Sequence, residues 1–137
     1  MYEKILAAID ESEAAERVLA AADELAKLSG GEIWLLHIWE GEPSVTRSVT
    51  SRSLAGAQSW LKTAVDKLAA SGTTAHAVVV ANLYAHAARE ITNFAIENEI
   101  DVIVVGSRRH SGVAELLIGS TTHKVIHLAD RPVVVVR

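Results

Sequence analysis

The sequence contains no cysteine and no long apolar run. Without cysteine, the chain has no disulfide, no thiol nucleophile and no thiolate metal site. The lack of cysteine also fits a reducing compartment. The apolar runs are too short to span a bilayer, and the charged start MYEKILAAIDESE resembles neither a signal peptide nor a transit peptide. These features predict a cytoplasmic protein with no membrane partner.

An excess of positive charge is absent as well. The 13 lysines and arginines are outnumbered by 17 aspartates and glutamates, which gives a formal net charge of −4. A general nucleic-acid-binding protein needs a basic face, so we expect no nucleic-acid partner. Trp34, Trp39 and Trp60 are accordingly interpreted as packing residues and not as a base-stacking platform. The length of 137 residues suits one domain, residues 1–137.

Short β-branched runs alternate with longer segments of helical period. The alternation, with several strands apolar throughout, predicts an α/β fold with a parallel sheet covered on both faces. The polar segment Glu42–Ser53 is interpreted as a solvated connection, with a lid, a partner site or a phosphorylation target as alternatives. The predicted strands are Ile5–Ile9, Glu32–Trp39, Thr74–Val80, Asp101–Val105 and Pro132–Val136, and the predicted helices are Ser12–Leu28, Leu54–Ala70, Ala85–Glu97 and Ser120–Leu128.

Helix-end signals support these boundaries. Ser12 is a candidate N-cap for the first helix, and the pair Gly30-Gly31 is expected to end it. The second helix should turn one apolar face inward, beginning with Leu54 and continuing through Ala57 and Leu61.

Two loops carry residues that suit a ligand. The segment from Ala8 to Ser12 leaves the first strand, and Gly106 leaves the fourth. In an open α/β sheet, ligands bind beyond the carboxyl ends of the strands, where the strand order reverses. If the first and fourth strands are neighbours, the two loops face each other.

The chemistry of these loops allows two interpretations. Gly106 would let the backbone approach a ligand. Gly119 precedes Ser120–Thr122 at a helix start, where N–H groups, hydroxyls and the helix dipole suit a phosphate. The same residues also form an ordinary helix start in which Ser or Thr caps the N–H groups. Asp10 could accept hydrogen bonds from a ribose or a base, but taken alone it is more simply a contribution to a helix cap.

Four segments, in chain order, carry a resemblance to a known family. They are Ile9-Asp10-Glu11-Ser12-Glu13, Leu36-His37-Ile38, Asp101-Val-Ile-Val-Val-Gly-Ser-Arg and Arg131-Pro-Val-Val-Val-Val. They are similar to the strand-one turn, the second strand end, the fourth strand and the closing strand of universal stress proteins. The resemblance implies a three-layer, open five-stranded parallel sheet of order 3-2-1-4-5, Rossmann-like and adenine nucleotide alpha hydrolase-like. It also implies a homodimer through Pro132–Val136.

The nucleotide-binding branch of that family carries Gly, two residues, Gly, nine residues, then Gly and Ser or Thr. Gly106, Gly119 and Ser120 match this pattern, and Arg109 stands where the middle glycine would be. The guanidinium could fill the phosphate space or pair with a phosphate in two-pronged geometry, and Gly112 could supply the backbone flexibility.

The resemblance also implies roles for individual residues. Asp10 would serve the adenosine end of the ligand, and the Ile38 main chain would meet the adenine. Ala8, on the same strand-one turn as Asp10, is a further candidate binding residue. The phosphates would be held by Gly106, Ser107, Gly119, Ser120 and Thr121. The implied ligand is ATP, or AMP or ADP, with or without Mg²⁺.

The expected function is binding of an adenine nucleotide as a regulatory or sensing ligand in a stress response. The alternative is a dimer that binds no nucleotide and acts through contacts with an unidentified protein partner. No nucleophile elbow, Walker loop or His-Glu-x-x-His helix is present, so we expect no enzyme. His123 and His127 share a helix face, but no third ligand lies at a telling spacing, and we therefore expect no metal site.

Overall fold

The computed structural model describes residues 1–10, 13–39, 53–81, 86–107 and 119–137. Strands and helices alternate along the chain as the sequence predicted, and each predicted strand end lies within one residue of the observed end. The elements are β1 (Lys4–Ala8), α1 (Ala14–Ser29), β2 (Glu32–Trp39), α2 (Leu54–Ala70), β3 (Ala75–Ala81), α3 (Ala87–Glu97), β4 (Val102–Gly106), α4 (Ser120–Leu128) and β5 (Val133–Val136).

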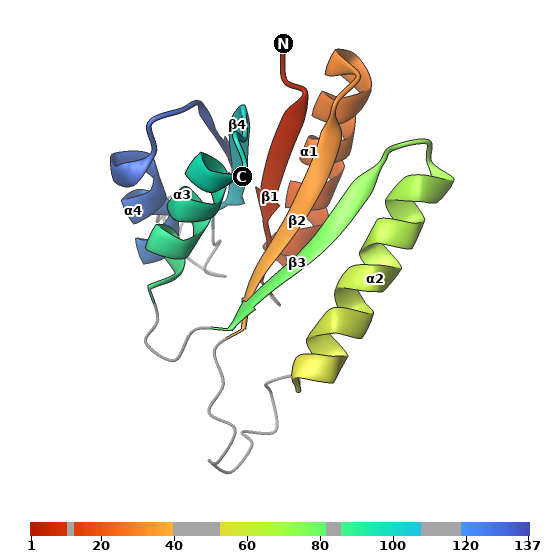
Figure 1. Ribbon diagram of the computed structural model, residues 1–137, viewed down its shortest axis with the longest axis horizontal. Coiled ribbons are helices and arrows are strands. Elements are labelled where there is room, and N and C mark those ends of the chain that lie inside the picture. The colour runs from red at the N-terminus through yellow and green to blue at the C-terminus, as the bar shows by residue number, and fades with distance from the viewer. Residues whose placement is uncertain (11–12, 40–52, 82–85, 108–118) are drawn as a thin grey trace.

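The five strands form one sheet in the order β3-β2-β1-β4-β5. Figure 1 labels β3, β2, β1 and β4 of this sheet. All neighbouring strands are parallel. β1 lies at the centre and pairs with β2 on one side and with β4 on the other, where Ala7 stands opposite Val104. The predicted sheet order is therefore confirmed. The order reverses between β1 and β4, so the carboxyl ends of these two strands mark the place where such sheets bind ligands.

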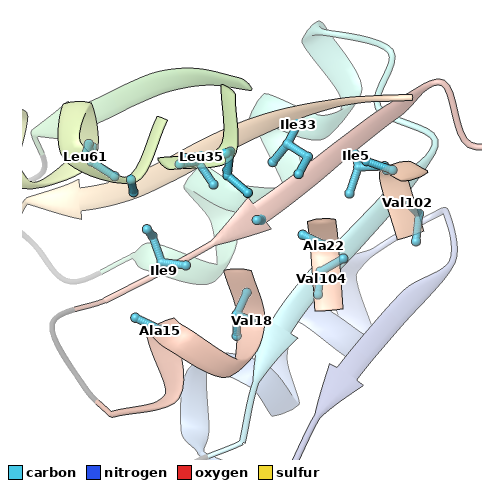
Figure 2. Packing of buried hydrophobic residues seen from close by; sticks show 14 residues of the cluster. Ile5, Ile9, Ala15, Val18, Ala22, Ile33, Leu35, Leu61, Val102 and Val104 are labelled. Atoms are coloured by element: carbon cyan, nitrogen blue, oxygen red, sulfur yellow. The ribbon is translucent and has the colours of Figure 1, made fainter. Parts of the chain in front are cut away.

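Helices cover both faces of the sheet, which gives the predicted three layers (Figure 1). Side chains alternate along β1, so Ile5 and Ala7 join the core under α1 and α2, whereas Leu6 joins the core under α3 and α4. Figure 2 shows the first core, in which Ile5, Ile33 and Val102 from three adjacent strands lie alongside Val18 and Ala22 of α1. The central strands are apolar throughout because they are buried on both sides.

The two glycines that follow α1 are required for different physical reasons. Gly30 has a φ of 71°, in the left-handed region that closes helices. Gly31 has no room for a side chain, because a Cβ there would lie 2.2 Å from the Tyr2 carbonyl oxygen. The predicted stop of this helix is thus confirmed.

Of two predictions about the helix starts, one is not tested and the other differs from the structure. The N-cap of α1 is Glu13 and makes no side-chain cap hydrogen bond, and the predicted cap, Ser12, lies outside the described residues. Leu54 does not turn inward, since 39% of it is exposed. It is the first residue of α2, and the helix reaches the core one turn later, at Ala57. None of the helices in the described ranges is long and apolar enough to cross a membrane.

Polar side chains tie distant segments together at the amino ends of the strands. The carboxylate of Asp101 accepts hydrogen bonds from the backbone N–H groups of Glu3 and Lys4, both at 2.9 Å. The guanidinium of Arg131 donates to the carbonyl oxygens of Ala95 and Ile100, at 2.8 and 2.7 Å. These bonds satisfy backbone groups at the end of α3 and fix the start of β4 beside β1.

A second polar cluster joins α1 to the turn before β3. Asp23 of α1 accepts hydrogen bonds from the buried hydroxyl of Thr73 and, at 2.7 Å, from Lys27 one turn along the helix. Burial raises the pKa of Asp23, but the hydrogen bonds from Lys27 and Thr73 outweigh it and hold the pKa below its ordinary value of 3.8. The ionised carboxylate is therefore the form that stabilises the fold.

This cluster predicts a pH dependence of stability. With its lowered pKa, folded Asp23 binds fewer protons than unfolded Asp23, so the unfolding free energy should decrease as the pH falls below about 4. Asp23→Asn should remove part of that decrease in urea titrations between about pH 5 and pH 2. Asp130→Asn is the matched control. Arg131 lowers the pKa of Asp130 too, but that carboxylate is exposed, so its substitution should change the acid slope less. Equal slopes for Asp23→Asn and the unchanged chain would refute the assignment.

Candidate functional site

The carboxyl ends of β1 and β4 bring together the two loops singled out in the sequence. Ala8 is the last residue of β1, Gly106 is the last residue of β4, and the two strands pair directly. Asp10 follows β1 and is exposed, whereas Ile38 lies near the end of β2 and is half-buried. The structure therefore places these four predicted residues at one end of the sheet.

The turn after β1 is held firmly by β2. The N–H of Ile9 donates to the carbonyl oxygen of Leu36 at 3.0 Å, and Nδ1 of His37 lies 3.0 Å from the carbonyl oxygen of Ile9. A carbonyl can only accept, so this bond requires the proton on Nδ1. The imidazole is buried and meets the ring of Trp60 edge-on, at 5.3 Å between centroids. His37 thus positions the residue before Asp10, a role that the sequence did not suggest.

Within the described ranges, no side chain caps the backbone N–H groups at the start of α4. Its N-cap is Gly119, which accepts from the N–H of His123 at 3.0 Å and makes no side-chain cap bond. The N–H groups of Ser120, Thr121 and Thr122 therefore have no acceptor within the helix, and they lie at the positive end of its dipole. The interpretation in which Ser or Thr caps this helix is wrong, because the capping position has no side chain. The exposed residues Ser120 and Thr121 can instead face an anion.

Thr122 fixes this helix start to the end of β4. Its hydroxyl is buried and donates to the carbonyl oxygen of Gly106 at 2.7 Å. The bond spans a sequence separation of 16 residues and holds the first turn of α4 beside the strand end. The sequence showed Thr122 only as part of a helix start, and no spacing signal pointed to this contact.

Gly106 is required by packing. A Cβ at this position would lie 2.9 Å from the Cβ of Ala14 and 3.1 Å from Cγ2 of Val18, so α1 lies directly against the end of β4. The sequence attributed this glycine to close approach of a ligand, whereas its contacts with α1 are sufficient to explain it.

Ser107 is likewise engaged within the fold. It is 1% exposed, its N–H donates to the carbonyl oxygen of Val136 at 2.8 Å, and its hydroxyl lies 3.2 Å from the same oxygen. Both of its donors are thus directed to β5. In this structure the hydroxyl predicted to hold a phosphate joins β4 to the edge strand.

One buried polar atom was missed by the sequence analysis. Nε of Arg17 on α1 is buried, and it has no hydrogen-bond partner among the residues that the structure describes. Arg17 precedes Val18, one of the two α1 residues that a side chain at Gly106 would meet. The residue as a whole is half-buried.

Several sequence predictions fall outside the described residues. They concern Arg109, Gly112 and the segment 42–52, on which the structure gives no account. Within the described ranges, no group of three or more His, Cys, Asp or Glu side chains could hold a metal ion.

Comparison with known proteins agrees with this architecture. Residues 1–137 match the profile of the Universal stress protein family. The chain belongs to this family. Universal stress protein YxiE of Bacillus subtilis is 35% identical, with both chains covered in full.

Solved structures of universal stress proteins superpose on the whole chain. One from Archaeoglobus fulgidus is 28% identical, covers 100% of both chains and has a TM-score of 0.81. A universal stress protein from Archaeoglobus fulgidus in complex with dAMP is 27% identical, with a TM-score of 0.77, and the match covers 99% of this chain and 98% of that one. The sheet order and the helix layers are therefore those of the family.

The packing of Gly106 predicts a stability effect. Gly106→Ala should lower the unfolding free energy by about 1–3 kcal/mol, because the added methyl group must displace α1 from the strand end. Urea denaturation followed by circular dichroism measures the change. Gly56→Ala, the same substitution inside α2, is the control and should not lower stability, since alanine favours a helix. If Gly106→Ala were as stable as the unchanged chain, the close contact with α1 would be wrong.

Proposed function

We propose that this universal stress protein binds an adenine nucleotide as a regulatory or sensing ligand in a stress response. One observation carries the proposal: the start of α4, whose N-cap is a glycine, is bonded through Thr122 to Gly106, at the point where the strand order reverses. Backbone N–H groups and the helix dipole there suit a phosphate. Asp10 stands at the end of the neighbouring strand.

A solved structure from the same family supports an adenine nucleotide as the ligand. A relative that matches nearly the full chain at 27% identity is described in complex with dAMP. Adenine nucleotides combine an anion with a base and a sugar that offer hydrogen bonds. The N–H groups of Ser120 and Thr121 would take the phosphate, with ATP, ADP or AMP as candidates and Mg²⁺ as a companion of the longer phosphate chains. Ala8, Asp10 and the main chain of Ile38 would serve the adenosine end.

The proposed role is binding and not catalysis. Binding to the folded state would stabilise it by mass action, and a ligand that prefers one conformation would shift the population towards it. Hydrolysis requires a positioned water and metal-ordered phosphates. The proposal assigns no residue to either task.

A second candidate function has its own observation. Gly106 matches the family's nucleotide motif and Ser107 was expected to hold a phosphate, yet α1 packing and the bonds to Val136 account for both without a ligand. This favours a protein that acts through contacts with other proteins and retains the motif residues for folding. The nucleotide experiments below separate the two candidates.

The edge strand β5 supports a homodimer under either candidate. It pairs with β4 on one side, and in the described part of the chain no strand pairs with its other side. Val133–Val136 is uncharged, and 39% of Val134 is exposed. Such an edge favours pairing with another strand. We infer that two copies associate through β5, as the segment Pro132–Val136 suggested.

Gly119→Asp tests the phosphate site without disturbing the fold. Gly119 has a φ of −58° and a ψ of 153°, which any residue can adopt, so the stability should change by only a few tenths of a kcal/mol. The new carboxylate would accept the α4 N–H groups and repel a phosphate. Calorimetric titration with ATP and Mg²⁺ should show binding to the unchanged chain and lose it in the variant. Equal affinities would exclude the start of α4 as the phosphate site.

The protein as purified provides an independent measurement. Denaturation should release adenine nucleotide, and phosphate release from added ATP should not exceed a control without protein. If no adenine nucleotide is released and the titration shows no heat in the working range, the protein-contact candidate remains. Phosphate release that is lost in Asp10→Ala would instead establish a hydrolase.

Val134→Asp should convert the dimer into monomers, because two carboxylates would be brought together along the paired edges. Light scattering after gel filtration measures the mass. Leu28→Asp is the control: Leu28 is 81% exposed on α1, so the same change should leave the dimer intact. A dimer that survives Val134→Asp, or a monomeric unchanged chain, would contradict pairing through β5.

A further inference from the structure

Two imidazoles lie together on the surface of α4. His123 and His127 stand one turn apart, and their ring centroids are 4.6 Å from each other at an interplanar angle of 75°. Both residues are exposed. They lie along the helix after its uncapped first turn, so the pair is separate from the residues assigned to the phosphate.

The separation of the rings fits a shared metal ion. A nitrogen–zinc bond of about 2.0–2.1 Å places each ring centroid about 3.2 Å from the ion. For nitrogen–metal–nitrogen angles of about 90–110°, the two centroids are then about 4.5–5.2 Å apart. The observed 4.6 Å falls within this interval, so the two rings already stand at the separation that a shared ion requires.

Two electrostatic effects near the histidine pair oppose each other, one favouring and one disfavouring a bound cation. His127 belongs to the last turn of α4, where the carbonyl end of the dipole favours a cation. Lys124 is exposed next to His123 and opposes a dication. The balance favours ions that gain most from neutral nitrogen ligands, in the order Cu²⁺ above Ni²⁺ and Zn²⁺, and disfavours Mg²⁺ and Ca²⁺, which prefer oxygen.

We propose that His123 and His127 form a two-imidazole chelate for a divalent transition-metal ion such as Cu²⁺ or Zn²⁺. Because no third protein ligand is present among the described residues, water completes the coordination. The ion links positions i and i+4 and thereby stabilises the helical conformation of α4. The sequence analysis expected no metal because it required three ligands, whereas an open two-ligand site needs only this pair.

The full chain without an affinity tag provides the test, with the metal alone as probe. Calorimetric titration with Zn²⁺ should show binding that falls about tenfold or more in His123→Ala, since a direct ligand is lost. The matched control combines His127→Leu with Leu128→His. It keeps all six histidines but moves one ring off the shared face, and Leu128 is 48% exposed, so the exchange is tolerated. This control should lose affinity as His123→Ala does.

Substoichiometric Cu²⁺ locates the ion by paramagnetic broadening of amide signals. The broadening should centre on α4, and Mg²⁺ should leave the spectrum unchanged. No Zn²⁺ binding to the unchanged chain, a spacing control that binds as tightly, or broadening centred elsewhere would each overturn the proposal. None of these outcomes bears on nucleotide binding, which is tested at Gly119.

Discussion

The close approach of α1 to the end of β4 is the constraint on which the carboxyl end of the sheet depends. A single methyl group at Gly106 would lie within 3 Å of Ala14, so the helix can occupy its position only because that residue is glycine. With α1 in place, the Gly106 carbonyl accepts the hydroxyl of Thr122, and the next residue binds β5. The same residue therefore meets α1 through its lack of a side chain and α4 through its carbonyl oxygen.

Two consecutive residues connect the proposed ligand site with the proposed dimer edge. Gly106 is bonded to the first turn of α4, and Ser107 is bonded to Val136 at the end of β5. Under the two proposals, phosphate binding at the start of α4 and pairing of β5 would therefore act on one short segment of backbone.

The fold was largely predictable because its signals are local and redundant. Apolar runs such as 102–105 and the left-handed glycine Gly30 each identify an element or its end without knowledge of the neighbours. Leu54 was misplaced because a helical period does not indicate how far along the helix the sheet begins.

The site was predictable in part only. Proximity of Asp10, Gly106 and the α4 start follows from strand order, and strand order followed from the family resemblance. The contacts made by Thr122 and His37 depend on the three-dimensional path between elements, which no residue spacing encodes. Gly106 shows the reverse difficulty, because a glycine that a ligand would need and a glycine that a helix needs have the same appearance in a sequence.

The central position of β1 has a consequence for how the chain folds during synthesis. β2 pairs with one side of β1 and β3 pairs with β2, and both leave the ribosome before Asp101 and β4, which complete the other side of β1. A three-stranded half-sheet can therefore assemble early with the apolar edge of β1 open to other chains. Protection of that edge by chaperones, or rapid translation of the segment up to β4, would decide how much of the newly made protein escapes aggregation.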